Sequence, residues 1–350
     1  MDRRKFLKIA VTTGTALSAA PLLDGCGTTA SPSPSPGLKV GNHPQAAVHL
    51  GDTVTPPNPE YQAEQYFANR LQELTNDEYS VILHPNSELG TAQAMNDLLK
   101  AGTALQFVKC NTGQMNNILP AIDAWNLPYA FVDPIKLKNA EHGPMGQKTD
   151  ELLQAGPGLK VLGWFDGGTR NVFSKIRPIK EPADISGLKI RVTSATSPLA
   201  QLFTGLGATA VPVGTSAIYG AFQSGQIDSA ENNVPFFVTN HLDEVSKYFS
   251  YTKHSYSIDP LMVSLAWFNS QPTDLQAAII QAATDTEAQE RTLWAAGEIT
   301  YKKQAVTDQG IIFNDTDVDI AAFKTSQPVK DAWAKGPTYG DLFTLLQSAQ

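Results

Sequence analysis

The chain has 350 residues, which is enough for two domains of ordinary size. Hydrophobic residues make up 42% and charged residues 17%, a balance typical of a globular protein and not of a disordered one. The formal net charge of −8 argues against a nucleic-acid-binding protein, which would normally carry a basic face, and two cysteines exclude a disulfide-rich framework.

The N-terminus has the pattern of an export signal. Residues 2–8 are rich in basic side chains and precede a short apolar stretch over 9–23, which falls below the about 20 residues that span a bilayer. The pair Arg3-Arg4, followed by Phe6-Leu7-Lys8, resembles the twin-arginine signal of bacteria. An ordinary secretory signal that happens to contain two arginines is the alternative.

Cys26 stands in a setting that favours lipidation. The preceding Leu23-Asp24-Gly25 resembles a lipobox, although an acidic residue replaces the small neutral one expected there, and alternating Ser-Pro residues follow as an extended spacer. We therefore predict a twin-arginine signal of the lipoprotein type over residues 1–25 and a Ser/Pro tether over 26–37, with attachment to the membrane through Cys26. Cleavage after Ala19-Ala20, which would leave a soluble protein, is the alternative.

From residue 38 onward, predicted strands and helices alternate. The apolar patterns predict helices over 61–75, 92–100, 135–153 with an interruption at Gly143-Pro144, 198–206 and 216–223, and strands over 79–84, 105–108, 160–165, 188–192 and 209–213. Such alternation favours an α/β fold with a largely parallel sheet.

The segment 273–307 predicts one long helix. It contains no proline and a single glycine, and as a continuous helix it would be roughly 50 Å long. Its apolar residues do not hold a heptad register, which argues against a coiled coil. We expect a helix that runs across two lobes.

No pattern of catalytic or metal-binding residues stands out. The six histidines are dispersed, and there is no P-loop, no Gly-x-Ser-x-Gly elbow and no Gly-x-Gly-x-x-Gly motif. Cys110 ends an apolar strand, which is typical of a small buried side chain. We therefore expect a protein that is not an enzyme and that has no cofactor and no metal site.

Two arginines and an asparagine occupy positions that are unusual for residues with a purely structural role. Arg170 follows a predicted strand, and strand ends are where ligands bind in α/β sheets, whereas Arg191 lies inside an apolar strand, where a charge is costly unless it is paired. Asn232 belongs to the polar cluster 228–233. Each arginine could form a salt bridge to a scaffold carboxylate or could grip the carboxylate of a ligand bidentately.

From Gly51 to about Thr338 the chain resembles the substrate-binding proteins of tripartite ATP-independent periplasmic (TRAP) transporters. Matching segments occur in family order: HPNSELG at 84–90, GTRN at 168–171, GLKIRV at 187–192, LGATAVP at 206–212, AIYGAFQSG at 217–225, IDSAEN at 227–232 and EVSKY at 244–248. The resemblance implies an α/β, two-lobed periplasmic-binding-protein-like fold with hinge strands and a long helix bridging both lobes. Lobe I would comprise residues 38–166 plus 258–296, and lobe II residues 167–257 plus 297–345.

The resemblance also implies roles for individual residues. Arg191 would form the selective salt bridge with the ligand carboxylate, Arg170 a second polar contact, and Asn232 a hydrogen bond near the carboxylate. Thr215 occupies a position where many members have phenylalanine, and Cys110 one where sialic acid binders have glutamate, which argues against sialic acid. The remaining candidates for the pocket are Asn111 beside Cys110, Asn58 or Glu60 from the other lobe, Asn233, and Trp164 as a pocket wall or a core residue.

The double asparagine at 232–233 resembles the variant found in members that bind uronates and aldonates. We therefore expect an extracytoplasmic receptor for a sugar acid, with C4-dicarboxylates, 2-oxo acids and aromatic acids as alternatives. Its partners would be this small carboxylate and the TRAP membrane subunits, with no nucleic acid. The protein would lie in the periplasm, at the outer face of the inner membrane. A sensory lipoprotein of the same fold and an exported lyase are the other hypotheses.

Overall fold

The computed structural model describes residues 46–131 and 133–349. The predicted signal, the tether and Cys26 lie outside the described residues. Within the described ranges, no helix combines the length and the apolar character that crossing a membrane requires.

The described residues form one mixed sheet, in the strand order β2-β1-β3-β8-β4-β7-β5-β6, with β9 paired to β8. The strands are β1 (Ala46–Gly51), β2 (Tyr79–His84), β3 (Phe107–Lys109), β4 (Leu159–Ser174), β5 (Lys189–Val192), β6 (Thr209–Pro212), β7 (Ser229–Asn232), β8 (Tyr248–Ser264) and β9 (Ile312–Asn314).

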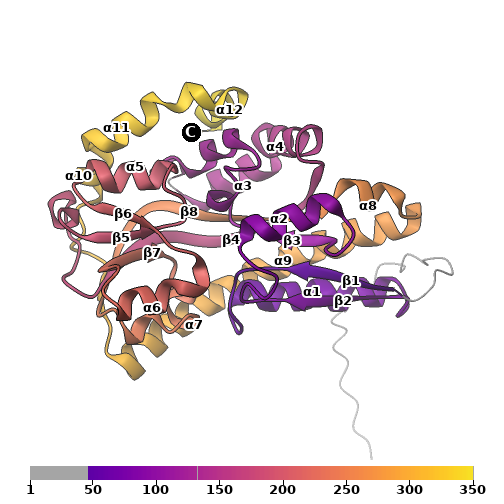
Figure 1. Cartoon of the computed structure of the whole chain (residues 1–350), viewed down its shortest axis with the longest axis horizontal. Coiled ribbons are helices and arrows are strands. Elements are labelled where there is room, and N and C mark those ends of the chain that lie inside the picture. The colour runs from indigo at the N-terminus through magenta and orange to yellow at the C-terminus, as the bar shows by residue number, and fades with distance from the viewer. Residues whose placement is uncertain (1–45, 132, 350) are drawn as a thin grey trace, which may run out of the picture. The chain divides into compact units, whose positions relative to one another are not determined.

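Helices cover both faces of this sheet (Figure 1). One face carries α2 (Ala92–Ala101), α3 (Pro134–His142), α4 (Pro144–Ala155), α5 (Pro198–Gly205), α10 (Ile320–Thr325), α11 (Gln327–Ala334) and α12 (Asp341–Ala349). The other face carries α1 (Pro59–Leu74), α6 (Ile218–Gln223), α7 (Val234–Thr239) and α9 (Thr273–Gln309), and α8 (Leu265–Ser270) follows β8. Four buried apolar clusters fill the space between helices and sheet.

The prediction of a largely parallel sheet is right for its two ends and wrong for its centre. The pairs β1–β2, β1–β3, β5–β6 and β5–β7 are parallel, but β4 and β8 are antiparallel to each other. These strands of 16 and 17 residues run through both halves of the sheet, with register shifts between Asp166 and Thr169 and between Arg170 and Val172. Arg170 therefore lies inside a strand and not at its end, where we had expected it.

The long helix α9 confirms the expected bridge. Its 37 residues pack against α1 and β4 in one half and against α7 in the other. Helix α12 packs its Leu342, Phe343 and Leu346 into the cluster formed with α3 and α4. The prediction had placed residues up to 345 in lobe II, and the lobe boundaries remain a prediction.

Candidate functional site

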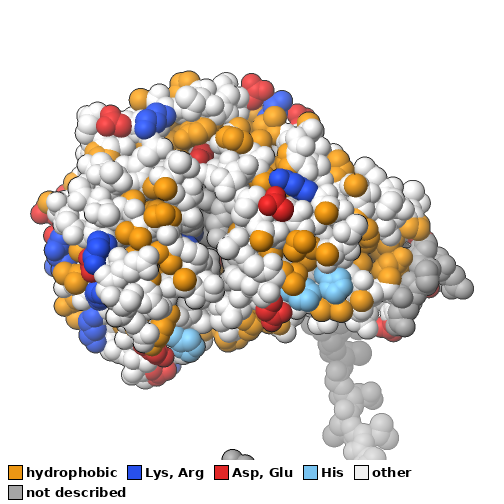
Figure 2. Space-filling view, in the orientation of Figure 1, with side chains coloured by type: hydrophobic (Ala, Val, Ile, Leu, Met, Phe, Trp, Pro, Cys, Tyr) orange, Lys and Arg blue, Asp and Glu red, His pale blue; other side chains and the backbone are white. Residues whose placement is uncertain are grey.

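A polar cavity opens where the carboxyl ends of β1, β3, β5, β6 and β7 meet the middle of β4 and β8. Its lining residues are Thr53, Val54, Asn58, Glu60, Lys109, Asn111, Gln114, Arg170, Arg191, Thr193, Thr215, Asn232, Asn233, Phe236, Ser257 and Asp259. The carboxyl ends of parallel strands are the usual place for ligands in such sheets. The space-filling view shows a furrow between the part that carries α6 and the part that carries α2 and β3 (Figure 2).

Most of the predicted site residues meet in this cavity although they are far apart in the chain. Those that line it are Asn58, Glu60, Asn111, Arg170, Arg191, Thr215, Asn232 and Asn233. Local folding explains part of this arrangement: Asn58 and Asn233 are the N-caps of α1 and α7, and their side chains accept hydrogen bonds from Glu60 N and Phe236 N. Capping holds these amides still at the cavity wall.

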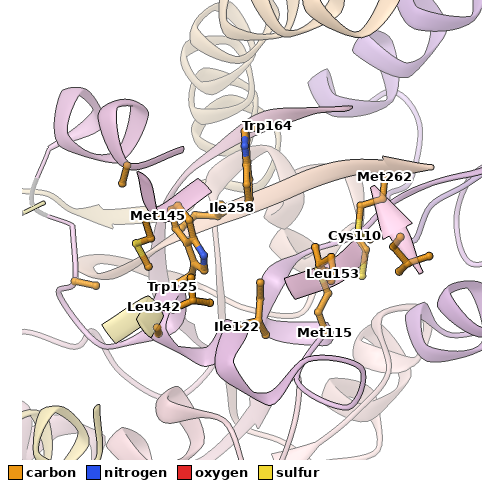
Figure 3. Packing of buried hydrophobic residues seen from close by; sticks show 14 of the residues in the cluster. Cys110, Met115, Ile122, Trp125, Met145, Leu153, Trp164, Ile258, Met262 and Leu342 are labelled. Atoms are coloured by element: carbon orange, nitrogen blue, oxygen red, sulfur yellow. The ribbon is translucent and has the colours of Figure 1, made fainter. Parts of the chain in front are cut away.

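Cys110 and Trp164 do not line the cavity. Both belong to an apolar cluster, in which Trp164 packs against Trp125 with ring centroids 5.2 Å apart (Figure 3). Side chains alternate along an extended segment, so Lys109 faces the cavity and Cys110 faces the core. Burial raises the pKa of the Cys110 thiol to about 12, which fits the interpretation of this residue as an inert buried side chain.

Arg191 is a buried cation without an ion pair among the described residues. It is 2% exposed, and its Nε donates a hydrogen bond of 2.9 Å to the carbonyl oxygen of Val213. Burial lowers its pKa to about 10, with Glu231 acting against this shift and Arg170 adding to it. The side chain is therefore charged at neutral pH, and this uncompensated charge at the cavity wall favours an anion there.

Arg170 is neutralised by the scaffold. Its Nε and Nη2 donate to the two carboxylate oxygens of Glu231, each at 2.7 Å. Although burial alone would raise the pKa of Glu231, Arg170 and His254 hold it down at about 2. The salt-bridge alternative thus holds for Arg170, and its Nη1 reaches Asn232 Oδ1 at 3.5 Å and Ser257 Oγ at 3.4 Å.

Lys109 lies at the opposite end of the cavity and is not among the predicted site residues. Its Nζ pairs with Glu60, with Asp52 at 3.1 Å and with Asp259 at 3.9 Å. Burial raises the pKa of Glu60 to about 8, because the loss of solvation outweighs the attraction of Lys109. A signal was present, because Lys109 is a charge in an apolar strand, the same pattern that singled out Arg191.

Asp259 and Ser257 were also missed, because the polar and apolar residues of β8 mix without a clear period. Asp259 Oδ2 accepts hydrogen bonds from Ser257 Oγ at 2.9 Å and from Asn111 Nδ2 at 3.2 Å. Among the described residues, no group of three or more histidine, cysteine, aspartate or glutamate side chains is arranged to hold a metal ion.

Hydrogen bonds also join the two halves through residues that do not line the cavity. Thr55 Oγ1 donates to Asn240 Oδ1 at 2.9 Å, and Asn116 Nδ2 donates to Ser194 Oγ at 3.2 Å. Two halves that share long strands and enclose a polar cavity define the class of periplasmic binding proteins.

The comparisons place the chain within that class. Residues 50–335 match the family described as bacterial extracellular solute-binding protein, family 7, and the chain belongs to this family. A solute-binding protein of Chromohalobacter salexigens is 31% identical over 317 residues, which cover 89% of this chain and 93% of that protein.

Two crystal structures of TRAP periplasmic solute-binding proteins share the fold. The protein from Chromohalobacter salexigens with bound D-glucuronate has 30% identity and a TM-score of 0.81, over 87% of this chain and 100% of its own. The protein from Xanthobacter autotrophicus with bound β-D-galacturonate has 29% identity and a TM-score of 0.77, with the same coverage of 87% and 100%.

Proposed function

We propose that the chain is the extracytoplasmic receptor of a TRAP transporter and that it binds a sugar acid, a uronate or an aldonate. Arg191 carries this proposal, because it is a buried guanidinium that lines the cavity and has no ion pair among the described residues. A ligand carboxylate would supply the missing charge and accept two parallel hydrogen bonds.

The rest of the cavity suits hydroxyl groups. The amides of Asn58, Asn111, Asn232 and Asn233 and the hydroxyl of Thr215 offer both donors and acceptors. The similar proteins with bound D-glucuronate and β-D-galacturonate support the same class of ligand. On this proposal the chain is a receptor and not an enzyme.

The cellular part of the proposal follows from the family. The receptor would deliver its ligand to the TRAP membrane subunits, where ion gradients drive transport. Anchoring through Cys26 at the outer face of the inner membrane belongs to the same proposal and rests on the sequence pattern alone.

Replacement of Arg191 by methionine tests the carboxylate site. We expect the parent to bind a uronate or an aldonate with a dissociation constant of about 1 µM or tighter. Loss of one partner of a buried charge pair costs roughly 3–5 kcal/mol, so Arg191→Met should weaken binding by more than about 100-fold in isothermal titration calorimetry. The ligand-free melting temperature should stay the same or rise, because an unpaired buried charge is costly.

Arg70→Met is the matched control. Arg70 is partly exposed and pairs with Glu73 and Asp285 away from the cavity, so its loss should leave the affinity unchanged. Undiminished binding by Arg191→Met would place the carboxylate elsewhere, and a parent that binds no sugar acid would refute the ligand class.

A further inference from the structure

The two ends of the cavity differ in charge. At one end Arg191 has no ion pair among the described residues, while at the other Lys109 faces the carboxylates of Asp52, Glu60 and Asp259. Besides burial, the charges that act on the pKa of Arg191 are those of Glu231 and Arg170. The pKa of Lys109 responds instead to its own group of carboxylates. The two ends therefore have different nearest charges, with Arg170 between them.

The floor between the two ends is hydrogen-bonded and already neutral. Arg170 satisfies Glu231 and joins Asn232 Oδ1 to Ser257 Oγ, which in turn donates to Asp259 Oδ2. Lys109 has more carboxylates around it than it can compensate. Among the described residues that line the cavity, Arg191 is thus the one cation that a ligand can still neutralise.

The carboxylates around Lys109 favour a ligand hydroxyl and disfavour a ligand carboxylate. A carboxylate such as Asp259 or Glu60 accepts a hydrogen bond from a sugar hydroxyl. A second ligand carboxylate at that end would meet the carboxylates of Asp259 and Asp52 in a buried site, where repulsion is strong because water is excluded. Lys109 cannot relieve this repulsion, because Asp52 and Glu60 already hold its ammonium group.

We propose that the cavity admits acids with a single carboxylate and rejects aldaric acids and other dicarboxylates, with Asp259 as the residue that determines this specificity. The inference rests on the proposed function, since it assumes a sugar acid whose carboxylate binds to Arg191. It orients the ligand with its carboxylate at Arg191 and its distal hydroxyls at Asp259 and Glu60.

Calorimetric titration with three acids that share the same carbon skeleton tests this selectivity for a single carboxylate, which we call the filter. The full chain is titrated with D-galactonate and D-galacturonate, which carry one carboxylate, and with galactarate, which carries two. We expect galactarate to bind at least 100-fold more weakly than the better of the two monoacids. Asp259→Asn should reduce the ratio of the galactarate to the monoacid dissociation constant at least tenfold. Asp259→Ser should reduce the same ratio if Asp259→Asn does not fold.

Asp123→Asn is the control, because Asp123 is a buried carboxyl that does not line the cavity, and it should leave the ratio unchanged. Equal binding of galactarate and a monoacid by the parent would overturn the filter and leave the proposed function intact. A ratio unaltered in both Asp259→Asn and Asp259→Ser would also overturn it. A parent that binds none of the three acids would overturn the filter and the proposed function together.

Discussion

At the scale of single residues, the two arginines have the same chemistry and different surroundings. Strand pairing of β4 with β7 brings Glu231 beside Arg170, and the bidentate contact neutralises both side chains. Arg191 on β5 has no such partner among the described residues, and its Nε hydrogen bond to Val213 fixes the guanidinium in the cavity wall. Because Arg170 already binds Glu231, that carboxylate does not pair with Arg191, and Arg191 is available to a ligand carboxylate.

Acid titration tests the pairing of Glu231. Its pKa of about 2 lies below the ordinary value of 4.5, so the pair stabilises the folded state above pH 4.5 and this stability is lost as the pH falls toward 2. The contribution at neutral pH is about 3 kcal/mol. Urea unfolding between pH 7 and pH 2.5 measures this effect. The free energy of unfolding of the parent should exceed that of Glu231→Gln by a constant amount down to about pH 4.5, and the difference should then shrink as the pH falls to 2.5.

Glu73→Gln is the matched control for this titration, because the carboxylate of Glu73 is exposed beside Arg70 and contributes little. If the parent and Glu231→Gln keep a constant difference in unfolding free energy down to pH 2.5, the pair does not carry the acid dependence.

At the scale of elements, the position of the cavity wall depends on how closely α1 and α9 approach. A Cβ atom on Gly297 of α9 would lie 2.3 Å from Cγ of Pro59, the first residue of α1. The neighbouring Asn58 and Glu60 line the cavity. Glycine is required there because nothing larger fits between the helices.

We predict that Gly297→Ala destabilises the protein although alanine favours a helix by about 1 kcal/mol. Overpacking typically costs about 1–3 kcal/mol, and displacement of α1 should also weaken ligand binding. Denaturant unfolding and calorimetry measure the two effects.

The matched control is Gly220→Ala on α6, where an added Cβ would meet nothing within 4 Å. This variant should be as stable as the parent or more stable, with the same affinity. Equal gains in stability for Gly220→Ala and Gly297→Ala would show that the helices do not pack at this distance.

At the scale of the whole described chain, β4 and β8 connect the two halves, and polar contacts outside the cavity lining join the halves again. Thr55 supplies one hydrogen bond to Asn240, and Asn116 donates to both Ser194 and Thr196. Such bonds contribute about 0.5–1.5 kcal/mol apiece. Loss of such a bond is therefore large enough to be measured in the rate of ligand release.

We therefore expect Thr55→Val and Asn116→Ala each to speed ligand dissociation by about 3- to 10-fold, since each lost bond favours the open form. Stopped-flow displacement measures the rate. Thr325→Val, which removes an exposed hydroxyl bonded to Ala321 O on α10, should dissociate at the parental rate. Unchanged rates in Thr55→Val and Asn116→Ala would mean that these contacts do not control opening.

Features that depend on neighbouring residues could be predicted from the sequence by itself. The absence of proline over 273–307 indicated α9, and a lone charge among apolar residues indicated Arg191, because periodicity and misplaced charge are local properties. The motif order indicated the family, and the resemblance indicated half of the residues that line the cavity.

Tertiary structure decided what depends on residues far apart in the chain. The Arg170–Glu231 pair joins positions 61 residues apart, and Lys109 meets Glu60 across 49. The antiparallel centre of the sheet could not be predicted either, since β8 shows no clear alternation and its partners are distant. A sequence shows where a charge is costly, but whether a scaffold residue or a ligand compensates it depends on which side chains the fold brings within reach.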